Sequence, residues 1–158
     1  MKLLIYLLAF VSLPLLAQEA IQPKDYTIEQ FYENTRIAGG YFSPDEDKLL
    51  VSSDKSGIFN LFEIDISNAE MQQITNSKED SYFAIDYVPN SENMLYSADK
   101  GGNEINHIYL LEENGNSRDL TPGENEKAQF AGWNKDKSGF YYISNKRNPQ
   151  FFDLYEMD

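Results

Sequence analysis

The sequence contains no cysteine and a single histidine, His107, among its 158 residues. The lack of cysteine excludes disulfide bonds, thiol nucleophiles and cysteine metal sites. Basic residues are few, since 13 Lys and Arg stand against 26 Asp and Glu, for a formal net charge of -13. A phosphate backbone is bound by clustered Lys and Arg, so this balance argues against a nucleic-acid partner. The G-x-S-x-G motif of a nucleophilic serine is also absent.

Long hydrophobic runs are absent beyond the N-terminus, where we predict that residues 1–17 form a secretory signal peptide. Lys2 supplies the positive charge, the apolar run extends from Leu3 to Val11, and Pro14 precedes a cut after Ala17. The run is short for a bilayer span, so we expect no membrane partner once the signal is removed. The sequence therefore predicts a secreted or periplasmic protein.

Residues 18–36 are expected to form a linker and a short helical lead-in. Thr27 and Gln30 have the spacing of a capping box, in which each side chain accepts a hydrogen bond from the backbone N–H of the other residue. A helix of one or two turns is therefore predicted there.

The rest of the chain is organised by a repeat of 45 to 47 residues. Each copy has a strand end, a polar turn and a second strand that carries an aliphatic–aromatic pair. The copies begin at Ser52, Ser97 and Ser144, and their pairs are Leu61-Phe62, Ile108-Tyr109 and Leu154-Tyr155. We expect the third strand of the first blade from Ile58 to Ile64, and the second strand of the third blade from Gly139 to Ser144. A repeat of this length with strand periodicity is typical of propeller blades.

We therefore predict an all-β fold: a partial β-propeller of about three four-stranded antiparallel blades, the last incomplete, in residues 37–158. The blades are expected at about residues 37–76, 82–122 and 128–158. Three blades are fewer than the four to eight that close a propeller, and an open array leaves unpaired sheet edges. The sequence is thus expected to be the front part of a longer polypeptide.

His107 is the first candidate for chemistry, and we interpret it as a half-buried structural residue. It lies in the predicted strand from Ile105 to Leu111, and no second histidine can assist it. A catalytic triad needs a serine held against the histidine, and nothing in the spacing indicates one. We therefore predict no catalytic residue at this position.

Three polar residues, Asp54, Asp99 and Asn145, recur at the same place in the three copies. A calcium or ligand site is one interpretation, because side-chain oxygens would line one rim. We prefer the other, in which Asp and Asn at the first turn position accept hydrogen bonds from nearby backbone N–H groups.

The remaining candidates also favour structural roles. Glu112-Glu113 precede the turn signal Asn114-Gly115 and are interpreted as turn solvation, not as a glycosidase pair facing across a cleft. Trp133 ends a first strand, so we expect it in the core. No catalytic, cofactor-binding or metal-binding residue is therefore predicted in this chain.

Five segments carry a family resemblance when they are taken in order. They are Phe42-Ser43-Pro44-Asp45, Ser56 to Phe62, Gly101 to Tyr109, Arg118 to Gly123 and Phe151 to Glu156. Together they resemble the N-terminal propeller of the prolyl oligopeptidase family of serine peptidases. TolB-type propellers share the Ser-Pro-Asp and Asp-Leu-Tyr elements. The family resemblance implies a propeller that covers a C-terminal α/β-hydrolase domain, and no position here matches the catalytic Ser, Asp or His of that domain.

The resemblance implies a propeller fragment of a secreted or periplasmic serine peptidase, whose blades control peptide access to a catalytic domain absent from this chain. Peptide substrates would then be partners through that missing domain, no cofactor is expected, and the 158 residues alone would hydrolyse nothing. The alternative is a non-enzymatic TolB-like propeller that binds proteins.

Overall fold

The computed structural model describes residues 24–158, and the chain divides into two units, Met1–Asn34 and Thr35–Asp158. The described part of the first unit contains the short helix α1 (Ile28–Tyr32). Its capping box is formed as predicted. Thr27 Oγ1 accepts from the Gln30 N–H at 3.4 Å, and Gln30 Oε1 accepts from the Thr27 N–H at 3.0 Å. The predicted signal peptide lies outside the described residues.

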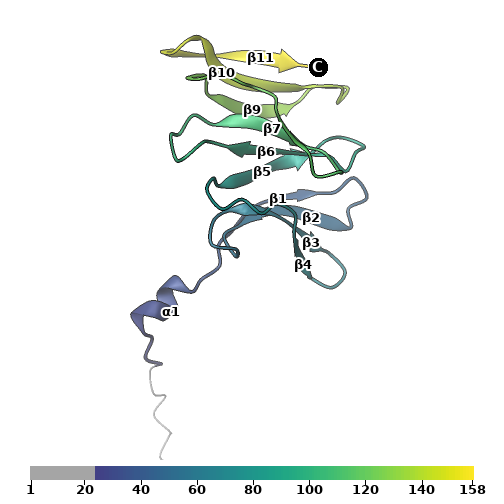
Figure 1. Cartoon of the computed structure of the whole chain (residues 1–158). Coiled ribbons are helices and arrows are strands. Elements are labelled where there is room, and N and C mark those ends of the chain that lie inside the picture. Colours follow the sequence, from purple (N-terminus) through teal and green to yellow (C-terminus); the bar gives the residue numbers. More distant parts are fainter. Residues whose placement is uncertain (1–23) are drawn as a thin grey trace, which may run out of the picture. The chain divides into compact units, whose positions relative to one another are not determined.

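The second unit consists of three antiparallel sheets, which follow one another along the chain as blades 1, 2 and 3 (Figure 1). Blade 1 contains β1 (Ile37–Phe42), β2 (Lys48–Ser53), β3 (Asn60–Asp65) and β4 (Met71–Gln73). Blade 2 contains β5 (Tyr82–Tyr87), β6 (Met94–Ala98), β7 (His107–Leu111) and β8 (Ser117–Asp119). Blade 3 contains β9 (Ala128–Trp133), β10 (Phe140–Asn148) and β11 (Phe151–Met157). The predicted all-β fold of three antiparallel blades is confirmed.

Local sequence explains the tight connection between the first two strands of blade 1. Ser43 Oγ accepts from the Lys48 N–H at 3.1 Å and donates to Asp47 Oδ1 at 2.9 Å, while Pro44 presets the backbone of the turn. Each blade is a meander of neighbouring strands, so turns alternate between its two ends. We call the end with the turns between first and second and between third and fourth strands the turn end.

The first strand of every blade contains a one-residue bulge. The register shifts between Ala38 and Tyr41 in β1, between Ala84 and Asp86 in β5, and opposite Tyr141 and Tyr142 in β9. In blade 1 the bulge places Gly39 at φ 79°, where an added Cβ would lie 3.1 Å from the Tyr41 ring. A bulge bends its strand and increases the local twist, so all three blades turn at the same point.

Two strands start later than the sequence predicted. We expected β3 from Ile58, but it begins at Asn60, whose amide donates to Ser56 Oγ at 3.1 Å and so holds the preceding loop outside the sheet. Likewise β7 begins at His107 instead of Ile105, because the Ile105 N–H donates to Asn103 Oδ1 at 2.9 Å. In both cases a polar side chain forms a hydrogen bond within the loop just before the strand.

The third repeat also differs from its prediction. We expected the second strand of blade 3 to end at Ser144, but β10 continues to Asn148 beyond a bulge and turns through Pro149 and Gln150 into β11. In addition, Ser144 pairs with the first residue of its neighbouring strand, as Ser53 and Ala98 do in blades 1 and 2. The third copy is therefore one residue out of the predicted alignment, and Ile143 is the counterpart of Ser97.

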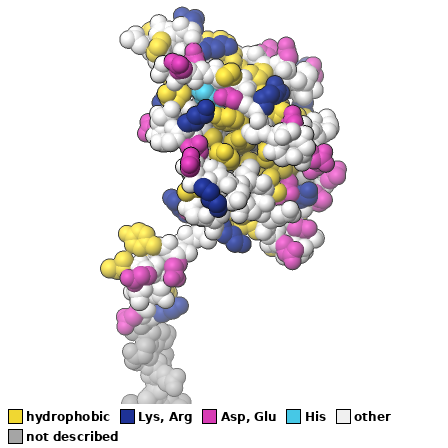
Figure 2. All heavy atoms as spheres, in the orientation of Figure 1, with side chains coloured by type: hydrophobic (Ala, Val, Ile, Leu, Met, Phe, Trp, Pro, Cys, Tyr) yellow, Lys and Arg dark blue, Asp and Glu magenta, His cyan; other side chains and the backbone are white. Residues whose placement is uncertain are grey.

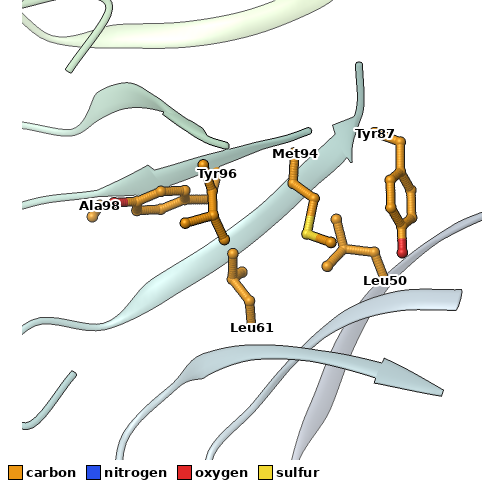
Figure 3. Packing of buried hydrophobic residues seen from close by; sticks show 7 residues of the cluster. Leu50, Leu61, Tyr87, Met94, Tyr96 and Ala98 are labelled. Atoms are coloured by element: carbon orange, nitrogen blue, oxygen red, sulfur yellow. The ribbon is translucent and has the colours of Figure 1, made fainter. Parts of the chain in front are cut away.

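The hydrophobic core lies between the blades. Leu50 and Leu61 of blade 1 pack against Met94, Tyr96 and Leu111 of blade 2, and Figure 3 shows the two leucines pointing toward Met94 and Tyr96. The second cluster places Leu95 and Ile108 of blade 2 against Ala128, Phe140 and Tyr142 of blade 3. Full burial of a leucine side chain contributes about 1.5–3 kcal/mol, so these contacts stabilise the stacking of one blade on the next.

A backbone hydrogen bond repeats at both interfaces. The Tyr82 N–H donates to the Phe59 carbonyl at 2.9 Å, and the Ala128 N–H donates to the Asn106 carbonyl at 2.7 Å. In each case the first residue of a blade binds the residue just before the third strand of the preceding blade. The blades are thus joined by the same polar contact as well as by an apolar one.

Candidate functional site

A groove between blades 1 and 2 has a volume of about 840 Å³. Its apolar lining comes from Ile74, Tyr82, Met94, Tyr96 and Leu111. β4 lines one side of the groove through Gln72 and Gln73. The volume of the groove lies within the range of small-molecule and peptide pockets.

The mouth of this groove is acidic. Five acidic residues from three turns at the turn end line it: Asp45, Asp47, Glu92, Glu112 and Glu113. In blades 1 and 2 these turns contain Asp and Glu but neither Lys nor Arg. Figure 2 shows magenta acidic side chains along the margin of the array toward which β11 points in Figure 1. The groove is therefore suited to cationic or hydrogen-bond-donating groups.

A lysine side chain, that of Lys48, lies at the mouth of this groove. The Lys48 ammonium is 3.6 Å from Glu63 Oε2 in blade 1 and 3.7 Å from Glu92 Oε2 in blade 2. Burial alone would lower the pKa of Lys48, but the carboxylates of Glu63 and Glu92 outweigh it and raise that pKa. Lys48 therefore stays charged and links the two blades.

Glu63 is the buried polar residue of the groove. It is 8% exposed, and its Oε1 accepts from the Tyr87 hydroxyl of blade 2 at 2.8 Å. Burial and the Glu63 carboxylate raise the pKa of Tyr87, so the phenol remains a donor. Sequence reasoning did not select either residue, although an acid inside the apolar strand from Leu61 to Ile64 was a usable signal.

His107 is more buried than predicted, at 7% exposure. Its Nδ1 lies 2.7 Å from Asp119 Oδ2, and Asp119 Oδ1 accepts from the Thr121 N–H at 2.9 Å. Nε2 is buried without a hydrogen-bond partner among the described residues, so no serine hydroxyl contacts it. The pair joins β7 to the end of β8.

The three recurring polar residues accept backbone hydrogen bonds, as the preferred interpretation predicted. Asp54 Oδ1 accepts from the Arg36 N–H and Asn145 Oδ1 from the Lys127 N–H, each at 2.7 Å, while Asp99 Oδ2 accepts from the Glu104 N–H at 2.7 Å. Residues 24–158 hold no cluster of His, Asp and Glu that could bind a metal ion.

Trp133 packs at the edge of the second core cluster, as expected for a residue that ends a first strand. Its indole Nε1 donates to Asp86 Oδ2 at 2.9 Å, which joins blade 3 to blade 2. Glu112 and Glu113 lie in a turn closed by the Gly115 N–H and the Glu112 carbonyl at 2.8 Å. These two acids also line the groove, a position that the turn interpretation alone did not predict.

Part of the chain is similar in sequence to a known protein family. A family model described as the dipeptidyl peptidase IV (DPP IV) N-terminal region matches residues 84–158, which include most of blade 2 and the described strands of blade 3. No curated protein matches the chain. Within residues 24–158, no helix is long and apolar enough to cross a membrane.

Two solved structures are similar in fold. TolB from Acinetobacter baumannii has a TM-score of 0.60 at 20% identity, over 78% of this chain and 30% of that chain. Putative TolB from Agrobacterium tumefaciens has a TM-score of 0.59 at 12% identity, over 77% of this chain and 46% of that chain. The chain therefore spans less than half of the length of either structure.

These findings define the chain as a β-propeller segment of about three blades. It is similar in sequence to the DPP IV N-terminal region and similar in fold to TolB. Both of the resemblances that the sequence carried are thus confirmed at the level of the propeller.

Proposed function

We propose that the chain is the blade-forming part of a secreted or periplasmic serine peptidase, in which the propeller controls peptide access to a catalytic α/β-hydrolase domain outside these residues. The observation that carries this proposal is the match of residues 84–158 to the DPP IV N-terminal region. Acyl transfer by serine requires a nucleophile beside a base, and His107 is held by Asp119 with no hydroxyl on its other nitrogen in the described residues. Catalysis is therefore assigned to the missing domain.

In this role, the groove between blades 1 and 2 is the surface that we expect peptides to contact. Its acidic mouth would favour segments that carry Lys or Arg, and Met94 and Tyr96 offer an apolar floor. Conversely, like-charge repulsion would disfavour acidic peptides.

A non-enzymatic propeller that binds proteins is the second candidate. Similarity in fold to two TolB structures over 77–78% of the chain favours it. In that case the same groove would receive a segment of a protein partner, and no hydrolase domain would follow.

Expression of the complete reading frame distinguishes the two functions. The long product and the 158-residue chain would each receive chromogenic peptides with proline or alanine before the leaving group, and a serine-directed phosphonate. We expect phosphonate-sensitive turnover by the long product and none by the short chain. A folded long product that does not react with the phosphonate would favour the protein-binding candidate. Turnover by the short chain, lost in His107→Ala, would contradict our assignment of catalysis to another domain.

The secretion proposal has its own measurement. The N-terminal sequence of the protein recovered from the periplasm or medium is expected to begin at Gln18, after removal of residues 1–17. Recovery of the uncut chain in the cytoplasm would contradict it.

A further inference from the structure

Two carboxylates at the mouth of the groove, those of Glu63 and Glu92, already hold a cation of the chain itself. Glu63 comes from β3 of blade 1, and Glu92 from the turn between β5 and β6 of blade 2. The Lys48 ammonium lies close to both, at 3.6 Å from Glu63 Oε2 and 3.7 Å from Glu92 Oε2. The position that this ammonium takes, which we call the paired-acid site, therefore accepts a cationic group.

Lys48 fits the paired-acid site loosely. Both of its contacts are longer than the usual hydrogen-bond distance of about 2.7–3.2 Å. By contrast, the Arg147 guanidinium lies 2.6 Å from the Asp153 carboxylate in blade 3. The Lys48 side chain is also 39% exposed, so water already reaches it. Ion pairs at such exposed positions contribute little to stability, and the ammonium can leave the site at low cost.

Both partners of this contact keep another interaction when they separate. Asp47 precedes Lys48 in the sequence, lines the same mouth, and its charge also acts on the Lys48 ammonium. Glu63 is 8% exposed, and its Oε1 accepts from the Tyr87 hydroxyl at 2.8 Å. Displacement of Lys48 therefore frees Glu63 Oε2 for an incoming donor while Oε1 stays bound.

We propose that the paired-acid site binds the guanidinium of an arginine in an extended peptide, which displaces the Lys48 ammonium. This inference rests on the proposed function, in which the groove contacts peptides. A guanidinium presents five N–H donors in a planar fork, so it can donate to Glu63 and Glu92 together, whereas an ammonium is a compact point charge. Such hydrogen bonds are charge-assisted, and they are shorter and stronger than the contacts that Lys48 makes.

The apolar part of the groove favours an aliphatic residue beside the arginine. Met94 of β6 and Leu111 of β7 line the groove together with both acids of the site. Ile74, which follows β4, also lines it and is half-buried. An aliphatic side chain placed there removes apolar surface from water, which is favourable. The ligand class is therefore a peptide that carries arginine next to an aliphatic residue.

The probe is a dye-labelled tetrapeptide, Ala-Arg-Leu-Ala with blocked ends, and its control has citrulline, an uncharged isostere, in place of arginine. Fluorescence anisotropy measures binding to the 158-residue chain and its variants. Lys48→Met removes the internal competitor. We expect it to bind the arginine peptide roughly tenfold more tightly, as for a site that is open in about one parent molecule in ten. In the Lys48→Met background, Glu63→Gln retains an acceptor for the Tyr87 hydroxyl but removes the charge, and is expected to reverse the gain.

Two control variants separate the competitor from the net charge. Lys48→Arg retains a competing cation and should bind the arginine peptide no more tightly than the parent chain. Lys55→Met lies in the loop between β2 and β3, outside the groove lining, and makes the same change of net charge as Lys48→Met. It should bind as the parent chain does.

A second measurement uses the parent chain without substitution. Lys48 is acetylated with an amine-selective reagent, and mass spectrometry gives the rate, with Lys55 as the internal reference. We expect the arginine peptide to raise the rate at Lys48, because the displaced ammonium loses the carboxylates that stabilise its charged form. The citrulline peptide should leave the rate unchanged.

The results separate this inference from the proposed function. Equal binding of the arginine peptide by the parent chain and Lys48→Met, with an unchanged acetylation rate, would overturn the displacement of Lys48 and leave peptide binding in the groove intact. Equal binding of the arginine and citrulline peptides would overturn the inference in the same way. If neither peptide binds to any variant, the groove is not a peptide surface, and that part of the proposed function is overturned as well.

Discussion

Equivalent aliphatic residues in the three blades differ in their exposure to solvent. Leu61 in blade 1 and Ile108 in blade 2 are 0% exposed beneath the following blade, whereas Leu154 in blade 3 is 64% exposed. The strand register at the three positions is the same, so the difference does not come from local structure. Burial here is a property of the stack: each blade is completed by its neighbour.

Alanine substitution at these positions tests this comparison most strongly. We expect Leu61→Ala to lower the free energy of unfolding by about 2–5 kcal/mol, because it leaves a cavity between blades 1 and 2. Leu154→Ala removes a side chain that is mostly in water, so we expect a change within about 0.5 kcal/mol. Urea unfolding followed by circular dichroism measures both. An equally large loss for Leu154→Ala would show that the outer face of blade 3 is covered in solution.

The comparison also shows how much of the fold could be predicted from the sequence. The repeat located Leu61, Ile108 and Leu154, because alternating apolar residues and polar turns are local patterns. It could not indicate which of the three is buried, since that depends on the presence of a following blade. For the same reason the groove was not predicted: its lining residues come from both blades and meet only when the blades stack.

The other differences between the predicted and the observed structure arise from side-chain contacts that the local sequence does not indicate. The polar segment after Ser144 indicated a turn, yet β10 continues through it. The Lys146 ammonium lies 3.8 Å from the centre of the Tyr155 ring and donates to the Tyr142 hydroxyl at 2.8 Å, and these contacts support the longer hairpin. Pairs such as Trp133 with Asp86 are far apart in the sequence, so neither residue predicts the other.

The threonine contact of blade 2 provides the next test. Thr121→Val leaves the Ile108 N–H without its acceptor in a fully buried position. We expect a loss of about 1–3 kcal/mol in unfolding free energy, which is the cost of a buried unsatisfied donor. Thr121→Ser retains the hydroxyl and is expected to recover most of the loss. An unchanged stability in Thr121→Val would show that the hydroxyl is dispensable.

The loss of stability at alkaline pH is a further test of the buried interface between blades 1 and 2. Burial between blades 1 and 2 raises the pKa of Tyr96 to about 12 from its ordinary value of 10. The folded state therefore disfavours ionisation, so this contribution to stability is complete below pH 10 and is lost as pH rises to about 12. We expect Tyr96→Phe to flatten the fall in unfolding free energy over that interval. A slope identical to that of the parent chain would contradict the burial of this phenol.

The smallest effect compares the equivalent residues Asp54 and Asn145. The side chain and backbone N–H of Arg36 hydrogen-bond to Asp54 and lower its pKa below the ordinary value. This contribution is therefore complete above the ordinary carboxyl pKa and is lost as pH falls through the lowered value. Solvent screens the pair, because it lies at an exposed position, so the effect on stability is small.

Asn145 makes the same backbone contact, to the Lys127 N–H, without a titrating group. Acid titration followed by amide chemical shifts should thus move the Arg36 amide through the loss of the Asp54 charge. In Asp54→Asn the backbone hydrogen bond can persist without that charge, so the acid-dependent shift of Arg36 is expected to disappear. If the Arg36 amide shifted equally in the parent chain and in Asp54→Asn, its response would have another source. The two blades would then differ by more than the exchange of a carboxylate for an amide at one repeated position.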